Sequence, residues 1–287
     1  MPDGDAVTVT AASAPTASLD DLKGRLRRLG RVVVAFSGGA DSSLLAKVAR
    51  DTLGRDAVLC ATALSPSLAG AEEADCRTLA DEWDLRWIGV PTVEMEDAVY
   101  VANGPDRCAR CKSALMDALG PLAASEGATV VLGVNVSDLG DHRPGQAAAA
   151  AAGAVFPLVE AGFTKADIRR SSRELGLRTW DKPAAACLAS RLPYGTPVTV
   201  GRLAAVESAE SALHSLGFGQ LRVRHHGDAA RLEVEPAALA EVVARRDEVV
   251  AAVRAAGFRF VALDLEGFRS GSLNRGLGQT GPGKDEP

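Results

Sequence analysis

One stretch, residues 35–43 (Ala-Phe-Ser-Gly-Gly-Ala-Asp-Ser-Ser), constrains the fold most because it joins a strand pattern to a helix pattern. Residues 31–36 are apolar and β-branched, as in a strand buried on both faces, whereas residues 42–50 carry leucine and valine at helical spacing. Gly38 and Gly39 let the backbone turn its N–H groups toward an anion at the start of that helix. The stretch therefore predicts a phosphate-binding loop into which a pyrophosphate would fit.

The side chains of the same stretch are also suited to phosphate, because Ser37, Ser42 and Ser43 add hydroxyl donors. The loop is not of the Walker type, since no Gly-Lys-Ser/Thr follows the glycines, and the Gly-x-Gly-x-x-Gly spacing of dinucleotide folds is absent. A plain glycine turn is the alternative. The strand pattern before the loop and the helix pattern after it favour nucleotide binding.

Strand and helix patterns alternate beyond the loop. Strands are expected at residues 57–63, 86–90 and 129–134, and helices at 20–29, 69–83 and 113–124. Such alternation is typical of a doubly wound parallel α/β sheet, which binds its ligand at the carboxyl ends of the strands. A polar loop, residues 135–145, follows the fourth expected strand, and we expect Asp138 and Arg143 in it to complete the nucleotide site.

Five cysteines, an odd number, fit reduced thiols better than a disulfide framework. Cys108 and Cys111 form a Cys-x-x-Cys at a helix start, without the second pair that a zinc site would need. A redox pair or a shared iron–sulfur site is more economical, and two incidental thiols are the alternative. Cys60 and Cys76 fall in a strand and a helix pattern and are expected to be buried.

The composition changes near residue 199. A short helix is expected at residues 146–152, a capping box at Thr164 and Asp167 opens another, and residues 180–195 form a proline-bounded loop. From residue 199 a smaller α+β unit follows, with helices at 202–216 and 237–255 and strands at 221–226, 231–235 and 259–265. The expected organisation is a disordered tail (1–18), a nucleotide domain (19–180), a cysteine-bearing linker (181–198), a C-terminal domain for substrate binding or oligomerisation (199–269) and a second disordered tail (270–287).

Arg222 and Arg224 alternate with apolar residues on one expected strand, so their guanidiniums face the same side. They could form a solvated sheet face or bind a phosphate dianion, which suits their forked geometry. The histidines lack ligand spacing, and we assign none of the four to a metal.

Composition excludes several classes of protein. The 287 residues are 47% apolar, which suits a globular chain of about two domains. The net charge of −5 and aromatic content of 4% argue against a nucleic-acid partner, which needs clustered cations or stacking platforms. No signal peptide, transit peptide or membrane span is evident, so we expect a cytoplasmic protein without a membrane partner.

The loop Ser37-Gly-Gly-Ala-Asp41-Ser42 resembles the PP-loop of the ATP pyrophosphatases, which cleave ATP to AMP and pyrophosphate. That resemblance implies that Asp41 lies near the magnesium ion that accompanies ATP. Further motifs make the resemblance specific: Arg107-Cys-x-x-Cys-Lys112, Gly133-Val-Asn-Val-Ser-Asp138-Leu-Gly-Asp141-His-Arg143-Pro-Gly, Lys182-Pro-Ala-Ala-Ala-Cys187-Leu-Ala-Ser-Arg191 and Leu263-Asp-Leu-Glu-Gly-Phe-Arg-Ser-Gly. Together these motifs resemble the LarE family of ATP-dependent sulfur transferases over nearly the whole chain except both tails.

The LarE resemblance implies adenylylation of the carboxylates of pyridinium-3,5-biscarboxylic acid mononucleotide and their conversion to thiocarboxylates, for the nickel-pincer cofactor of lactate racemase. It implies that Cys187 is the sulfur-bearing cysteine, which in some members becomes dehydroalanine. It also implies that Cys108, Cys111 and Cys187 could instead hold a [4Fe-4S] cluster, and that Arg222 and Arg224 bind the substrate phosphate.

The expected cofactors are ATP, Mg²⁺ and the cluster. The expected partners are the small nucleotide substrate, further copies of the chain in a homo-oligomer, and other enzymes of the nickel-pincer pathway in transient contact. Two alternatives stay open: a PP-loop tRNA thiolase, which shares the loop and often a three-cysteine cluster, and a non-catalytic nucleotide-sensing module with a redox-active thiol pair.

Overall fold

A parallel sheet forms the centre of the N-terminal two thirds of the chain. The computed structural model describes residues 17–139, 144–183 and 186–269. Strands β1 (Val32–Ala35), β2 (Val58–Leu64), β3 (Arg86–Pro91) and β4 (Thr129–Leu132) are parallel, in the order β3-β2-β1-β4. Val34 of the central strand β1 pairs with Cys60 on one side and Val131 on the other. The expected parallel α/β sheet is confirmed.

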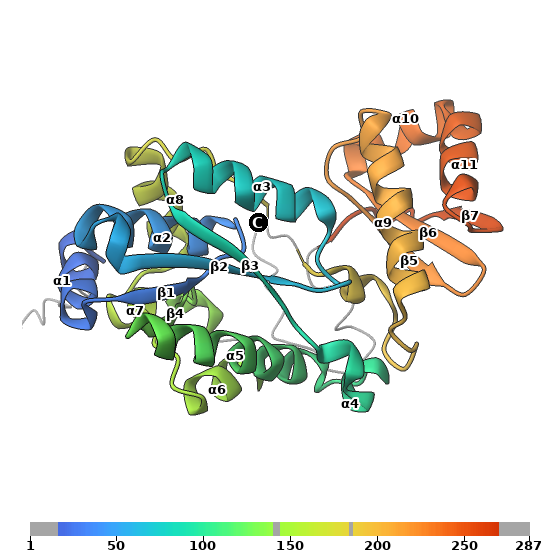
Figure 1. Ribbon diagram of the computed structural model, residues 1–287. Coiled ribbons are helices and arrows are strands. Elements are labelled where there is room, and N and C mark those ends of the chain that lie inside the picture. The colour runs from blue at the N-terminus through green and yellow to red at the C-terminus, as the bar shows by residue number, and fades with distance from the viewer. Residues whose placement is uncertain (1–16, 140–143, 184–185, 270–287) are drawn as a thin grey trace, which may run out of the picture.

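Helices cover both faces of this sheet (Figure 1). One face carries α2 (Ala40–Leu53), α3 (Gly70–Glu82) and α8 (Lys165–Glu174), with α1 (Leu19–Leu29) packed against α2. The other carries α5 (Arg107–Glu126) and α6 (Pro144–Ala151). The expected capping box of α8 is confirmed, because Thr164 and Asp167 exchange side-chain and backbone hydrogen bonds. Short elements complete this part: α4 (Ala98–Val101), α7 (Pro157–Glu160), η1 (Arg55–Ala57), η2 (Glu94–Glu96), η3 (Val136–Asp138) and η4 (Leu188–Arg191).

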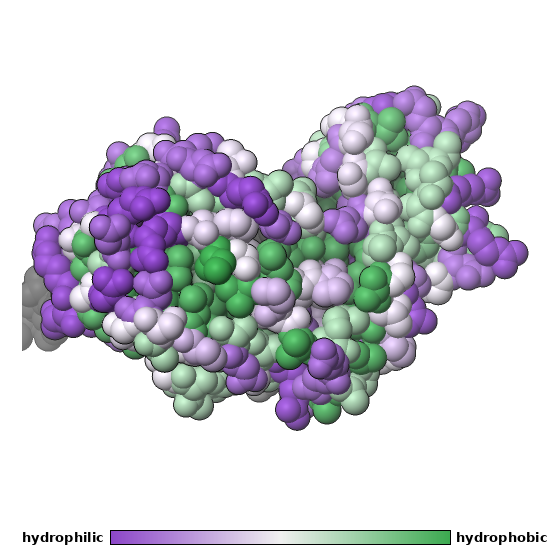
Figure 2. All heavy atoms as spheres, viewed as in Figure 1, coloured by the Kyte–Doolittle hydropathy of each residue, from purple (hydrophilic) through white to green (hydrophobic). Residues whose placement is uncertain are grey.

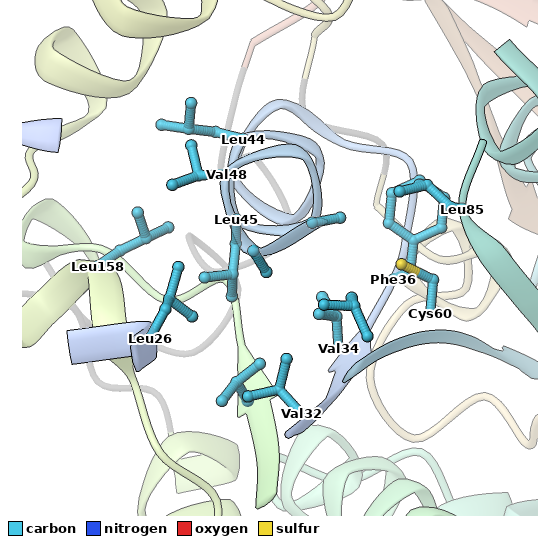
Figure 3. Close-up of a cluster of buried hydrophobic side chains, with 14 of the residues drawn as sticks. Leu26, Val32, Val34, Phe36, Leu44, Leu45, Val48, Cys60, Leu85 and Leu158 are labelled. Carbon is cyan, nitrogen blue, oxygen red and sulfur yellow. The ribbon is translucent and has the colours of Figure 1, made fainter. Parts of the chain in front are cut away.

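The largest apolar cluster lies between the sheet and α2 (Figure 3). Leu45 of α2 faces Val32 and Val34, which are at most 1% exposed. The ring of Phe36 lies beside the thiol of Cys60, so the residue before the glycines is held in the core. Burying each such side chain is worth about 1.5–3 kcal/mol. The start of the predicted loop is therefore attached to the most buried strand of the sheet.

A second sheet follows near the C-terminus. Strands β5 (Leu221–His226) and β6 (Ala229–Val234) are antiparallel, and β7 (Phe260–Leu263) is parallel to β6. Helix α9 (Val200–Ser215) packs against β5, and α11 (Arg246–Ala255) packs against α9. In Figure 1 these elements lie beyond the carboxyl ends of the parallel strands. A hydrogen bond joins the two parts, because Gly70 N at the start of α3 donates to Glu207 Oε1 at 2.6 Å.

The single helix expected at residues 237–255 is wrong. The structure has η5 (Pro236–Ala238), α10 (Leu239–Ala244) and α11, with a break at Arg245. The Arg245 side chain donates to Leu216 O at 2.8 Å and stacks on the Phe218 ring at 5.1 Å, so it helps to close the end of α9. A tertiary contact of this kind leaves no mark on helical periodicity.

A shallow groove of about 550 Å³ lies along edge strand β3. Figure 2 shows apolar side chains gathered over this face, among them those of β3. The groove is lined by Arg86, Trp87 and Ile88 in the first half of β3, so it lies away from the carboxyl ends of the strands. Among the described residues, no helix is both long and apolar enough to span a membrane.

Candidate functional site

The loop between β1 and α2, residues 36–39 (the glycine loop), starts from a fixed point. Thr62 Oγ1 donates to Phe36 O at 2.6 Å, and Trp87 Nε1 donates to Thr62 Oγ1 at 2.9 Å. Gly38 has a φ of +66°, which side-chain-bearing residues rarely adopt. A Cβ on Gly38 would also lie 3.0 Å from Cys76 Sγ. Both the backbone angle and the packing therefore require glycine at this position.

The serine hydroxyls of this region have internal partners. Ser37 N donates to Ser42 Oγ at 3.2 Å, and the Ser37 and Ser42 hydroxyls are 3.0 Å apart. Ser42 Oγ in turn donates to Gly39 O at 3.2 Å. Ser43 is fully buried, and its hydroxyl has no hydrogen-bond partner in the described part of the chain. The sequence suggested three anion donors, whereas two of these hydroxyls also hold the loop in shape.

The glycine loop lies where the order of the strands reverses. The chain runs from β1 outward through β2 and β3 and then returns to β4 on the opposite side of β1. In open parallel sheets, the crevice at such a point is where ligands bind. The segment after β4 closes against α2, because a Cβ on Gly133 would lie 2.7 Å from Ser42 N. The first-turn N–H groups of α2 face this crevice and suit an anion.

Asp138, one of the expected nucleotide-site residues, helps to shape the segment after β4. It is 4% exposed, and its Oδ2 accepts from the side chain of Asn135 at 2.8 Å. Lys165 Nζ lies 3.4 Å from Asp138 Oδ1. Asn135 is fully buried, and its Oδ1 has no hydrogen-bond partner among the described residues. Arg143 lies outside the described residues.

Asp41 occupies the first turn of α2, where the helix dipole favours a negative charge. A carboxylate beside a phosphate-sized anion would repel it unless a cation lay between them. The position of Asp41 thus fits a magnesium ion that arrives with a nucleotide, because Mg²⁺ is commonly held by one or two carboxylates together with phosphate oxygens.

The three predicted site cysteines lie on two segments. Cys108 and Cys111 belong to the first turns of α5, one exposed and the other half-buried, and Cys187 is exposed at the start of η4. Arg107 connects these segments: it is 3% exposed, and its Nη1 donates to Ala189 O at 2.8 Å and to Asn103 Oδ1 at 2.5 Å.

Asn103 holds the other end of the same segment. Its side-chain Nδ2 donates to the backbone carbonyls of Pro193 and Thr196, each at 2.8 Å. Its backbone carbonyl accepts from Gly195 N. We call this pair, Asn103 and Arg107, the polar clamp. The polar clamp fixes residues 189–196 against the start of α5, and this brings Cys187 toward Cys108 and Cys111.

The pKa of Cys111 is affected by the two neighbouring thiols. Burial, followed by the neighbouring Cys187 and Cys108, raises the pKa of the Cys111 thiol, and Lys112 lowers it; the net pKa is about 12. The carboxylate of Glu94, 3% exposed, also raises the pKa of Cys111, and its Oε2 has no hydrogen-bond partner among the described residues. Cys111 is therefore protonated at neutral pH in the absence of a bound cation.

Within the described ranges, no three His, Cys, Asp or Glu side chains lie close enough to share one metal ion. An iron–sulfur cluster makes a different demand, because each cysteine ligates its own iron atom. Three thiols on two adjacent segments, two of them exposed, are a donor set of the kind that such clusters use. The residues therefore fit a cluster, though not a single metal ion.

Arginines surround the segment that bears Cys187. Arg191 forms a two-pronged ion pair with Glu210, both distances 2.9 Å, and its Nη1 donates to Cys187 O at 3.2 Å. Arg224 is 2% exposed and donates to Ser190 O at 2.7 Å and to Glu233 Oε2 at 2.8 Å. The alternative of a solvated sheet face is therefore wrong for Arg224.

Arg222 lies near these guanidiniums. Its own guanidinium stacks over the Phe268 ring at 4.7 Å. Its pKa is lowered by burial first, and then by the positive charges of Arg191 and Arg224. Glu233 and Glu210 raise the pKa of Arg222 only in part, so a bound anion would stabilise its positive charge.

Comparisons with known proteins agree with these motifs. No protein-family model matches the chain. It is 45% identical to an uncharacterised protein of Synechocystis sp. over 90% of this chain and 97% of that protein. It is 41% identical to the pyridinium-3,5-bisthiocarboxylic acid mononucleotide synthase of Lactiplantibacillus plantarum, over 87% of this chain and 91% of the synthase. The chain belongs to the LarE family. An uncharacterised protein of Methanocaldococcus jannaschii is 25% identical over 84% of this chain.

In this LarE-family chain, sequence reasoning missed several residues of the site. Asn103 and Arg107 were not assigned a role, although a polar pair spaced four residues apart, next to a Cys-x-x-Cys, is a usable signal. Glu94 carried no signal, because its burial depends on how η2 packs against α5. Lys182 stood in a quoted motif, but its position beside the glycine loop depends on α3.

Proposed function

We propose that this chain is an ATP-dependent sulfur transferase that adenylylates the carboxylates of pyridinium-3,5-biscarboxylic acid mononucleotide and converts them to thiocarboxylates. The relative of known name is a synthase of the corresponding bisthiocarboxylic acid mononucleotide. The observation that carries the proposal is the polar clamp, which fixes the segment of Cys187 against the Cys-x-x-Cys of α5.

The first half-reaction uses the glycine loop as a PP-loop. A carboxylate oxygen of the substrate attacks the α-phosphorus of ATP, the bond to the β-phosphate oxygen breaks, and pyrophosphate leaves. The α2 N-terminus and the residues Ser37, Gly38, Gly39, Ser42 and Ser43 bind the phosphates, while Asp41 holds the accompanying Mg²⁺. Asp138 shapes the opposite wall of the crevice. The product is an acyl adenylate, which is a far better electrophile than a carboxylate.

The second half-reaction replaces AMP by sulfur. A sulfur nucleophile attacks the acyl carbon, and the bond to the AMP oxygen breaks. If Cys187 itself attacks, a thioester forms. Loss of the Cα proton with cleavage of the Cβ–Sγ bond then leaves the thiocarboxylate on the substrate and dehydroalanine in the chain. Exposure of Cys187 at the start of η4 suits this role.

A [4Fe-4S] cluster on Cys108, Cys111 and Cys187 would leave one iron without a protein ligand, open to carry a sulfur atom. The buried Cys111 must then lose its proton, and metal binding supplies the driving force for that loss. In this form Cys187 keeps its sulfur through repeated turnover.

The substrate phosphate binds near Arg222 and Arg224. The positive charges of Arg191 and Arg224 beside Arg222 favour a dianion, and Arg191 Nη1 also donates to the carbonyl oxygen of Cys187. The phosphate would thus lie on the side of the segment that faces β5.

The test uses anaerobically prepared protein and measures the pyrophosphate that is released and the thiocarboxylate that is formed. The intact mass of the protein is measured before and after turnover. Release of pyrophosphate only with the carboxylated pyridinium nucleotide supports the proposal and excludes a nucleotide sensor. A mass loss of about 34 Da at Cys187 indicates that this cysteine gave up its sulfur, whereas several turnovers without mass loss, in protein that binds iron, indicate the cluster. Tight, salt-sensitive binding of total tRNA would point to a tRNA thiolase instead.

A further inference from the structure

The ammonium of Lys182 lies against the glycine loop. Its Nζ is 3.7 Å from the position that a Cβ would occupy on Gly38. The Lys182 side chain is only 18% exposed, and its Nζ donates to Glu72 Oε2 and Asp75 Oδ2, each at 2.7 Å. A partly buried cation thus lies beside Gly38, a residue without a side chain to shield its backbone.

The charge of Lys182 is maintained in this position. Burial acts to lower the pKa of Lys182, but the hydrogen bonds to Asp75 and Glu72 outweigh it, and the pKa is raised. Asp75 is held in turn by Arg178, whose Nη2 donates to Asp75 Oδ1 at 2.6 Å. The ammonium is therefore fixed by two carboxylates of α3, one of which is itself held by Arg178.

One donor of Lys182 stays available. An ammonium has three N–H donors, and Glu72 and Asp75 accept from two of them. Within the described part of the chain, no acceptor is present for the third. Two carboxylates beside a phosphate site would be unfavourable without a cation, so the arrangement is better explained by a ligand that completes it.

We propose that Lys182 binds the pyrophosphate part of ATP through this third donor, and that Glu72 and Asp75 hold the ammonium at the glycine loop when no nucleotide is bound. This inference rests on the adenylylation proposed above. It adds a side-chain cation to a loop whose own donors are backbone N–H groups and hydroxyls. Pyrophosphate and ATP are recognised by this contact, whereas AMP, which lacks the β- and γ-phosphates, is not.

The same residue connects the two half-reactions. Lys182 precedes Cys187 by five residues, so their Cα atoms lie at most about 18 Å apart even if the chain between them is extended. The residue that holds the leaving pyrophosphate and the residue that bears the sulfur therefore belong to one short segment.

The test compares inorganic pyrophosphate, ATP and AMP as ligands in calorimetric titrations of the full chain with Mg²⁺. Lys182→Met removes one charge-assisted hydrogen bond. The affinities for pyrophosphate and ATP should therefore fall about 10- to 100-fold, and the affinity for AMP should stay within about twofold of the wild-type value. The matched control is Lys47→Met, because Lys47 also pairs with a carboxylate, Asp51 at 2.6 Å, but on the helix beyond the loop. It should leave all three affinities unchanged.

Glu72→Gln separates ligand binding from a purely structural ion pair. Asp75 still holds the ammonium in this variant, and one of its two competing carboxylates is gone, so pyrophosphate should bind as tightly as in the wild type or more tightly. Weaker binding in Glu72→Gln with intact folding would overturn the inference. Lys182→Met leaves Glu72 and Asp75 without their cation. If it cannot fold for that reason, the double variant Glu72→Gln/Asp75→Asn is compared with the triple variant that also carries Lys182→Met, because neither protein contains these two carboxylates.

The failures of the two proposals differ. Wild-type protein that binds neither ATP nor pyrophosphate overturns the adenylylation and with it the role of Lys182. If the wild-type protein binds both ligands and Lys182→Met binds pyrophosphate with the wild-type affinity, only the role of Lys182 is overturned.

Discussion

Replacing Arg107 by methionine tests the polar clamp, because methionine retains the apolar stem of the side chain and removes its guanidinium. Arg107 is 3% exposed and bonds Asn103 Oδ1 and Ala189 O through the same nitrogen. Hydrogen bonds to a charged group are worth about 1.5–3 kcal/mol each. The buried Asn103 Oδ1 would lose its bond from Arg107, whereas Ala189 O would still accept from Leu192 N. We expect the free energy of unfolding to fall by about 3–5 kcal/mol, measured as a shift of the urea midpoint.

The functional effect of Arg107→Met should be selective. Residues 189–196 would no longer be fixed to α5, so Cys187 would leave the neighbourhood of Cys108 and Cys111. Carboxylate-dependent pyrophosphate release should persist, while thiocarboxylate formation should drop at least about tenfold, the equivalent of 1.4 kcal/mol in positioning. Cross-linking of Cys187 to the other two thiols by a short bifunctional thiol reagent should fall in parallel.

Arg110→Met is the matched control for Arg107→Met. Arg110 lies one turn further along on the same helix, its side chain is 50% exposed, and its nearest carboxylate, Asp97, is 3.7 Å away. An exposed pair of this kind contributes about 0–1 kcal/mol. Our account of the polar clamp is refuted if Arg107→Met matches Arg110→Met in urea midpoint, cross-linking and sulfur transfer.

Three further predictions concern pyrophosphate release, packing at Gly133 and the pH dependence of stability. Asp41→Ala should abolish pyrophosphate release and lower the free energy of unfolding by no more than about 1 kcal/mol, the size of an interaction with the helix dipole; near-normal turnover would remove Asp41 from the mechanism. Gly133→Ala should destabilise the chain by about 1–3 kcal/mol and lower the affinity for ATP, because the new Cβ would lie 2.7 Å from Ser42 N. An unchanged ATP affinity would contradict the close packing of the segment after β4 against α2. Stability should fall as the pH rises above about 9, because burial raises the pKa of Cys60 from 9.0 to about 12 while the unfolded thiol already ionises; Cys60→Ala should flatten this fall in urea titrations at pH 8–11.

The buried carboxylate of Glu94 bears on the same thiols. Its charge disfavours ionisation of Cys111, so Glu94→Gln should make Cys111 easier to deprotonate. The rate of Cys111 alkylation should then rise at a given pH. An unchanged alkylation profile would show that Glu94 does not face the thiols.

Local patterns were sufficient for the parallel sheet and the glycine loop. A β-branched run, two glycines and a helical repeat lie within twenty residues, and each acts through its immediate neighbours. The helix starts were predicted for the same reason: the capping box at Thr164 and Asp167 is closed by atoms three residues apart. Such features depend on short-range sterics and hydrogen bonds, which a sequence displays directly.

Tertiary structure decided which of these features meet. The break at Arg245 comes from a contact with Leu216, 29 residues away. The approach of Cys187 to the Cys-x-x-Cys depends on Arg107 and Asn103, whose partners are 82 to 93 residues distant. Lys182 reaches the glycine loop only because carboxylates of α3, 107 and 110 residues earlier, hold it there. Residue types alone determined the available chemistry, but its assembly depends on long-range contacts whose partners no local pattern specifies.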